Sequence, residues 1–87
     1  MRFMVVERFA PEKAHAISER FRRDGRLLPD NVTYVASWMT LDGGKCFQIM
    51  EAPDERALGV WLDRWADLVD FEVSPILTSD EYWAAKR

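Results

Sequence analysis

The chain has 87 residues, of which 48% are hydrophobic and four are tryptophan. This length suits one domain and leaves no room for a second hydrophobic core. Twelve basic and 15 acidic residues give a net charge of −3, which argues against a nucleic acid as the main partner because phosphate backbones attract basic surfaces.

The first part of the chain predicts a strand, a helix and a second strand. Residues 2–9 are rich in β-branched and aromatic side chains. Their apolar run is too short for a secretory signal or a membrane span, so we expect a soluble cytoplasmic protein without a membrane partner. A helix is predicted over residues 11–24, because Pro11 suits a first turn and Gly25 a C-terminal stop. Residues 32–40 alternate in hydrophobicity as a strand does.

The second part begins with a hairpin signal. Asp42-Gly43 is a typical turn, and residues 45–51 return as the next strand. Asp54 is the expected N-cap of a second helix, which carries the clearest helical periodicity in the chain. Its predicted apolar face consists of Leu58, Trp61, Leu62, Trp65, Leu68 and Val69.

The end of the chain predicts an edge strand and a short helix. Residues 71–77 read as a strand. Because proline cannot donate to the ladder, Pro75 indicates that this strand lies at a sheet edge or leaves the pairing at that position. Ser79 is the expected cap of a terminal helix. The element order predicts an α+β fold, a single ferredoxin-like βαββαβ domain over residues 1–87. Its four-stranded antiparallel sheet carries two helices on one face and is followed by a short C-terminal helix.

The hairpin turn also predicts which side chains share a sheet face. A two-residue turn at Asp42-Gly43 places Ser37, Met39, Cys46, Gln48, Met50 and Val35 on one face, and Tyr34, Ala36, Trp38, Phe47 and Ile49 on the other. A loop one residue longer or shorter would put Gln48 beside Trp38 instead. Neither face is polar enough for water, while two helices cover only one of them. We therefore expect a homodimer through the sheet face.

Four stretches carry a resemblance to a known family. They are FMVVERF (3–9), RLLPDNVTYVASWM (26–39), CFQIME (46–51) and WLDRWADLVDFEVSPI (61–76). They resemble a family of small bacterial proteins known as a domain of unknown function, which looks related to the dimeric α/β-barrel superfamily. The resemblance implies the fold and the dimer but no activity. The superfamily includes cofactor-free monooxygenases, haem enzymes, lactone isomerases and effector-binding domains, and a fold alone does not choose between them.

Candidate ligand-binding residues are Tyr34, Trp38, Gln48 and His15. Gln48 lies in a strand that reads as buried, where an unpaired amide costs about 1–3 kcal/mol. It must therefore bond to Ser37 or Tyr34, to water, to a second subunit or to a ligand. Tyr34 and Trp38 either fill the core or line a pocket for a small apolar or aromatic ligand. Trp61 and Trp65 are expected in the core.

The polar residues reveal no catalytic motif. His15 is the only histidine, so we expect no metal site; it is either a general acid–base group or an ordinary exposed helix residue. Cys46 is a nucleophile or, more in keeping with a free cysteine, an inert buried group. A cluster of four arginines could bind an anion or could complement a helix end: Arg20, Arg22, Arg23 and Arg26.

Three functions are compatible with these patterns. The first is a homodimeric small-molecule-binding or sensing domain without a cofactor. The second is a cofactor-independent enzyme of monooxygenase or isomerase type, with His15, Cys46 or Arg8 as its titratable group. The third is a structural or interaction dimer without a ligand. The sequence identifies no catalytic residue and leaves open whether the protein is an enzyme.

Overall fold

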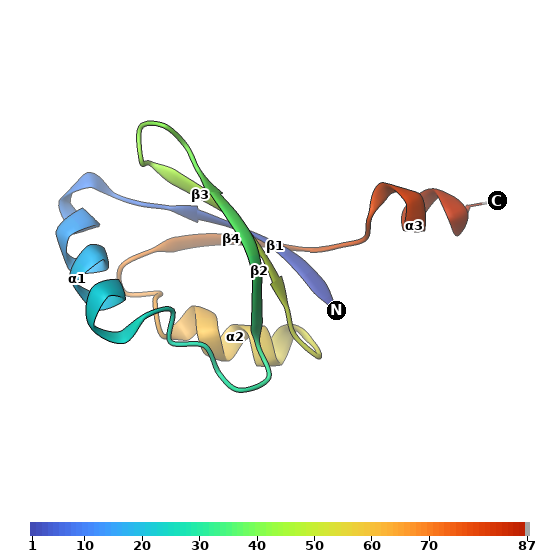
Figure 1. Cartoon of the computed structure of the whole chain (residues 1–87), viewed down its shortest axis with the longest axis horizontal. Helices are drawn as coiled ribbons and strands as arrows, with labels where there is room; N and C mark the ends of the chain where they lie inside the picture. Colours follow the sequence, from blue (N-terminus) through green and yellow to red (C-terminus); the bar gives the residue numbers. More distant parts are fainter. Residues whose placement is uncertain (87) are drawn as a thin grey trace.

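In the computed structural model of the chain, which describes residues 1–86, four strands form one antiparallel sheet in the order β2-β3-β1-β4 (Figure 1). The strands are β1 (Arg2–Arg8), β2 (Thr33–Met39), β3 (Lys45–Glu51) and β4 (Asp70–Ile76). The helices are a 3₁₀ turn η1 (Pro11–Lys13) leading into α1 (Ala14–Asp24), then α2 (Glu55–Asp63) and α3 (Ser79–Ala84). Helices α1 and α2 lie on one side of the sheet, and α3 extends away from it. This α+β architecture is compatible with the predicted ferredoxin-like fold.

Capping residues explain where the helices begin and end. The Asp54 side chain accepts a hydrogen bond of 2.8 Å from the backbone N–H of Ala57 and so caps α2 as predicted. Gly25 ends α1 with a φ of 66°, a conformation that glycine adopts readily. The prediction for α3 was wrong by one residue: Thr78, not Ser79, is the N-cap, and it forms a reciprocal capping box with Glu81.

Helix α2 is shorter than its periodicity predicts. The α-helix ends at Asp63, although Trp65 and Val69 beyond it are buried. The Arg64 carbonyl accepts a hydrogen bond from the side chain of Arg20 at 3.0 Å, and the Leu68 N–H bonds to the Trp65 carbonyl instead of continuing the α-helical pattern. A series of tight turns therefore carries the predicted apolar face to β4.

The β2–β3 pairing confirms the predicted register at the hairpin and corrects it further away. Trp38 pairs with Phe47 and Ser37 with Gln48, as a turn at Asp42-Gly43 requires. The pairing shifts by one residue between Tyr34 and Ala36, where β2 bulges. Tyr34 therefore lies on the face opposite to Trp38, and the prediction that these two residues share a face was wrong.

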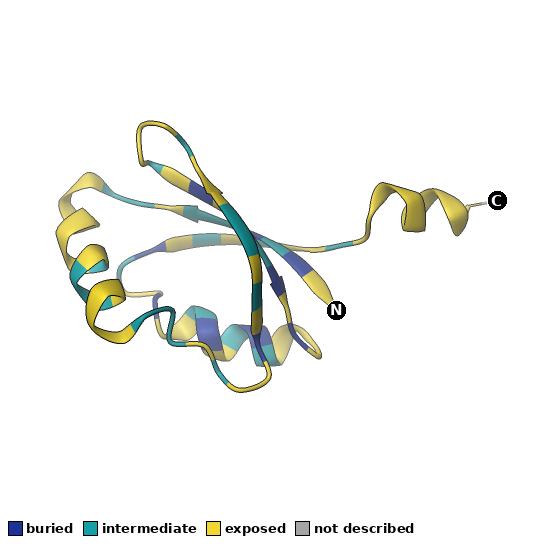
Figure 2. Cartoon of the chain, in the orientation of Figure 1, coloured by how far each residue is buried: buried dark blue, intermediate teal, exposed yellow. Residues whose placement is uncertain are grey.

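The core lies between the sheet and α2. Phe3, Val5 and Met50 are fully buried, and Leu58 and Trp61 of α2 pack onto them. The predicted edge position of the proline-containing strand is confirmed, because β4 ends the sheet. In contrast to α2, helix α1 contributes no fully buried residue (Figure 2). The core therefore depends mainly on α2, and α1 touches it only at its margin, through the partly buried Ile17.

The other face of the sheet, turned away from both helices, is apolar and uncovered. Trp38 is 58% exposed and its neighbour Phe47 is 38% exposed. We call this surface the outer-face patch; it consists of Met4, Val6, Ala36, Trp38, Phe47 and Ile49. Contiguous apolar surface of this kind is typical of interaction sites. None of the helices within residues 1–86 is long and apolar enough to cross a membrane.

Candidate functional site

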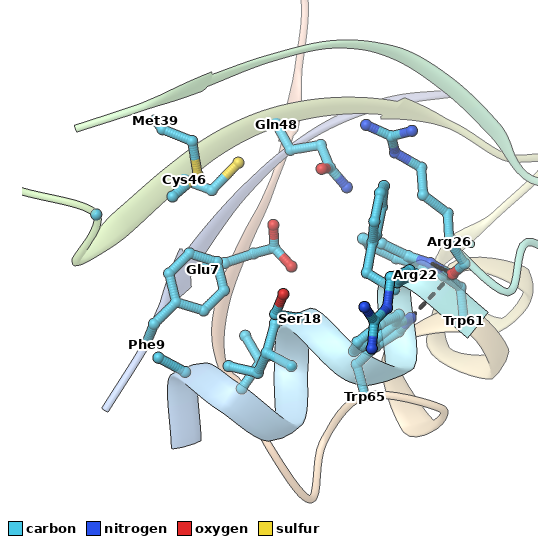
Figure 3. A pocket seen from close by; sticks show the side chains of 15 residues that line it. Glu7, Phe9, Ser18, Arg22, Arg26, Met39, Cys46, Gln48, Trp61 and Trp65 are labelled. Atoms are coloured by element: carbon cyan, nitrogen blue, oxygen red, sulfur yellow. Dashed lines mark hydrogen bonds between the residues drawn. The ribbon is translucent and has the colours of Figure 1, made fainter. Parts of the chain in front are cut away.

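A cavity of about 480 Å³ lies between α1 and the helix-facing side of the sheet (Figure 3). Ile17, Ser18 and Phe21 line it from α1, and Glu7 and Gln48 line it from the sheet. Its remaining lining residues are Phe9, Ala14, Arg22, Arg26, Met39, Gly43, Cys46, Trp61, Trp65 and Val69. An apolar cavity with a few converging polar groups is the usual form of a small-molecule site.

The polar bonds of α1 lead to the loop before β4. Both guanidinium NH groups of Arg20 donate to the carboxylate of Asp67, at 2.8 and 2.7 Å, and Lys13 donates to the Asp67 carbonyl at 3.2 Å. The hydrogen bonds from Arg20 hold the pKa of Asp67 below its usual value. Phe21, the largest apolar side chain of α1, remains 47% exposed. Helix α1 thus covers one side of the cavity, and its side chains do not fill the space.

The connection after α1 is held firmly at one end of the cavity. The indole N–H groups of Trp61 and Trp65 both donate to the Arg26 carbonyl, each at 2.9 Å. The next residue, Leu27, has a φ of 59°, in the left-handed region that non-glycine residues rarely adopt. Its carbonyl accepts a hydrogen bond of 2.8 Å from Arg64. These bonds compensate for the backbone strain at Leu27 and determine where the Arg26 side chain begins.

The four members of the predicted arginine cluster differ in whether they form ion pairs. Three of its members form ion pairs with Asp67, Glu19 and Asp24: Arg20, Arg22 and Arg23. Arg26 alone in this cluster has no acidic partner in the part of the chain that the structure describes. Its guanidinium lies 3.7 Å above the centre of the Tyr34 ring and 5.3 Å from that of Phe21.

Glu7 is the main polar group that sequence reasoning missed. It follows Phe3 and Val5 on the helix-facing side of β1, and its carboxyl group points into the cavity (Figure 3). Burial raises the pKa of Glu7, and neither the hydrogen bond with Cys46 nor the positive charge of Arg26 cancels this effect. The sequence did contain a signal for this position. Phe3, Val5 and Glu7 alternate with period two along the strand, so Glu7 is a charged residue at an inward position that follows two apolar ones.

Cys46 lies beside Glu7 and is chemically quiet. Burial raises the pKa of its thiol to about 11, and the negative charge of Glu7 contributes in the same direction. The thiolate is the nucleophilic form of cysteine, and at neutral pH it is almost absent here. The structure therefore agrees with the interpretation of Cys46 as a buried, unreactive group.

Gln48 retains unused hydrogen-bonding capacity toward the cavity. The residue is only 4% exposed, and its side-chain N–H₂ group donates to the thioether sulfur of Met50 at 3.3 Å. Thioether sulfur is a weak acceptor. The expected partners Tyr34 and Ser37 bond to each other instead, at 2.7 Å. No buried side-chain oxygen or nitrogen within residues 1–86 lacks a partner, so the free amide oxygen of Gln48 must be accessible from the cavity.

The structure brings one of the four sequence-predicted ligand-binding residues into the cavity. Gln48 lines it, whereas Tyr34 stands beside it under Arg26, and Trp38 lies on the opposite face of the sheet. His15 is an exposed residue of α1 that does not line the cavity. Arg8, a candidate for the enzyme hypothesis, forms an exposed ion pair with Glu72 at 3.0 Å.

The substitution Glu7→Gln is expected to make the protein more stable at neutral pH. A carboxyl group whose pKa is raised by folding contributes stability that is fully present below the unfolded value, near 4.5, and that is lost as the pH rises through the folded value. The neutral amide avoids this loss. Urea unfolding should therefore show equal stability at about pH 4 and a growing advantage for the variant toward about pH 7.

Glu51→Gln serves as the control for this experiment, because Glu51 is an exposed residue of the neighbouring strand. Its effect should stay within about 0.5 kcal/mol at both pH values. A Glu7→Gln variant that is less stable than the wild type at neutral pH would show that the carboxylate is well compensated in the folded protein.

The fold and the cavity together define a small α+β domain that carries a hollow between its first helix and an antiparallel sheet. Within this class, the chain belongs to the family described as domain of unknown function DUF3303, whose family model matches residues 1–86. The resemblance to a family of unknown function is therefore confirmed. The chain has no match among curated proteins.

Proposed function

We propose that the chain is a small-molecule-binding or sensing domain and that its ligand, a small and largely apolar or aromatic molecule, occupies the cavity under α1. The observation that carries this proposal is the composition of the cavity wall. Aromatic side chains surround a half-buried carboxyl group and an amide with a free oxygen. Polar groups in such a wall lower stability unless they bind something, so their presence favours a ligand.

A cofactor-independent enzyme is the second candidate, and Glu7 is the observation that favours it. A carboxyl group with a raised pKa, facing a cavity, is suited to accept or return a proton from a bound substrate. The three titratable groups suggested by the sequence do not support catalysis: His15 and Arg8 are exposed outside the cavity, and the thiol of Cys46 stays protonated.

Filling the cavity is expected to abolish binding. Ser18 lines the cavity from α1 and is an exposed residue of a helix that contributes no fully buried residue, so Ser18→Phe should occupy the space without unfolding the protein. We expect naphthol, a neutral aromatic probe, to bind the wild type at micromolar to millimolar concentrations. Isothermal titration calorimetry should show at least a roughly 10-fold loss of affinity in the variant.

His15→Phe is the matched control, because it introduces the same side chain on an exposed position of the same helix. This variant should bind naphthol as the wild type does. Absence of binding to the wild type, or equal binding by Ser18→Phe, would contradict the proposal and would favour a structural dimer without a ligand.

We also propose that the chain forms a homodimer through the outer-face patch, as proteins of the dimeric α/β-barrel superfamily do. The patch is apolar at its centre, with Trp38 and Phe47 side by side, and charged at its margins, where Arg8 and Glu72 lie. An apolar centre with a charged rim is the usual composition of a protein interface. This interface and the cavity use opposite faces of the sheet, so the two proposals can fail independently.

A further inference from the structure

Two side chains of opposite charge face the cavity without an ion-pair partner. Within residues 1–86, neither the carboxyl group of Glu7 nor the guanidinium group of Arg26 forms a salt bridge. The other arginine of the cavity wall, Arg22, is already paired with Glu19. The cavity wall thus carries one carboxyl group and one guanidinium group that both lack an ion-pair partner.

The two groups are close enough to influence each other but do not pair. The positive charge of Arg26 lowers the pKa of Glu7 against the effect of burial. In Figure 3 the amide of Gln48 lies between them in the view, and all three side chains converge on the same hollow. A molecule inside the cavity could therefore contact the Glu7 carboxyl group at one end and the Arg26 guanidinium group at the other.

The surroundings of Arg26 favour a planar anion. Aromatic rings lie against the guanidinium, with Tyr34 at 3.7 Å and Phe21 at 5.3 Å from ring centre to carbon. Stacking of this kind leaves the N–H groups at the guanidinium edge free, and this edge matches the two oxygens of a carboxylate. The backbone carbonyl of Arg26 is held by Trp61 and Trp65, so the position from which its side chain extends is fixed before a ligand binds.

We propose that the cavity takes an aromatic carboxylic acid that carries a hydroxyl group at a distance from the acid. Arg26 pairs with the ligand carboxylate, and Glu7 accepts a hydrogen bond from the ligand hydroxyl. The ring lies among the aromatic side chains of the wall, including Phe9 and Phe21. This inference rests on the proposed function, since it specifies the ligand class of the same cavity.

Three probes of one size test the ligand class on the unaltered protein. Hydroxynaphthoic acid carries both groups, naphthoic acid lacks the hydroxyl, and naphthol lacks the acid. Each lost hydrogen bond to a charged group should weaken binding roughly 10- to 100-fold in calorimetry at neutral pH. Hydroxynaphthoic acid should therefore bind most tightly of the three.

Substitutions assign each group of the ligand to its partner. Arg26→Gln should lower the affinity for hydroxynaphthoic acid roughly 10- to 100-fold and leave the affinity for naphthol unchanged. Glu7→Gln should lower the affinity for the two probes that carry a hydroxyl group and leave the affinity for naphthoic acid unchanged. Arg26→Lys keeps the charge and should show an intermediate loss, because an ammonium cannot match both oxygens of a carboxylate. Arg23→Gln is the control, because Arg23 is exposed, pairs with Asp24 and does not line the cavity. This variant should bind all three probes as the wild type does.

The outcomes separate this inference from the proposed function. If all three probes bind equally well and neither cavity substitution distinguishes them, the cavity binds aromatic molecules but the assigned ligand class is wrong. If no probe binds the wild type, the proposed function and the inference are both overturned. If naphthol binds but hydroxynaphthoic acid is excluded, Arg26 does not pair with the ligand carboxylate, and the inference alone is overturned.

Discussion

The double substitution Trp38→Lys, Phe47→Lys is expected to leave the chain folded and to make it monomeric. Both side chains are exposed in the isolated subunit, at 58% and 38%, so lysine can occupy these positions without disturbing the core. In the proposed dimer the same positions lie at the centre of the interface, where two ammonium groups from each subunit would be buried without partners. Affinity should fall by roughly two orders of magnitude or more.

Light scattering after gel filtration at micromolar concentration measures this effect directly. The wild type should have about twice the 10.2 kDa mass of one chain, and the double variant about the mass of a single chain. Circular dichroism should show unchanged secondary structure. Val60→Lys provides the matched control, because Val60 is a 46% exposed residue of α2 on the far side of the sheet. A monomeric wild type, or a dimeric double variant, would rule out the outer-face patch as the interface.

The second large effect is expected from Trp61→Ala, which should destabilise the protein by about 3–5 kcal/mol. Trp61 is only 2% exposed, packs against Phe71 with ring centres 5.8 Å apart, and donates a hydrogen bond to the Arg26 carbonyl. Its removal leaves a large void in a core that depends mainly on α2. Because domains of this size have a total stability of only about 5–15 kcal/mol, the loss is a substantial fraction of it.

Trp61→Phe separates packing from hydrogen bonding in this prediction. Phenylalanine keeps most of the apolar volume but loses the N–H donor, and Trp65 still satisfies the Arg26 carbonyl. We expect a cost of about 1–2 kcal/mol in urea unfolding followed by circular dichroism. Trp83→Ala, on the 63% exposed side chain of α3, should change the stability by less than about 0.5 kcal/mol. Equal effects of Trp61→Ala and Trp83→Ala would contradict the description of the core.

Local chemistry explains which elements could be predicted. The strand over residues 45–51, the turn at Asp42-Gly43 and the cap at Asp54 depend on neighbours only a few residues away, and all three are found where expected. The length of α2 was mispredicted for the opposite reason. At its end the Arg64 carbonyl accepts a hydrogen bond from Arg20, 44 positions away in the chain.

In the candidate site, too, features that depend on nearby residues could be predicted and those that depend on distant residues could not. The sequence identified Gln48 as a polar residue in a buried strand, and the structure places it in the cavity wall. It could not identify the partners of Gln48, because the bulge in β2 moves Tyr34 to the helix-facing side and pairs it with Ser37. Nor could it separate Arg26 from the other arginines of its cluster, since their ion pairs depend on side chains brought together by folding.

The sequence by itself determined the order of the elements, the antiparallel hairpin and a sheet with two apolar faces, because periodicity, turn residues and caps act over short distances. Only the tertiary structure decided where the cavity lies and which residues face it. Helix α1 is attached through Arg20 and Asp67 to the loop before β4, and the cavity lies between this helix and the sheet. The resulting space exposes Glu7, Gln48 and Arg26 to one another, although 41 positions separate Glu7 from Gln48 along the chain.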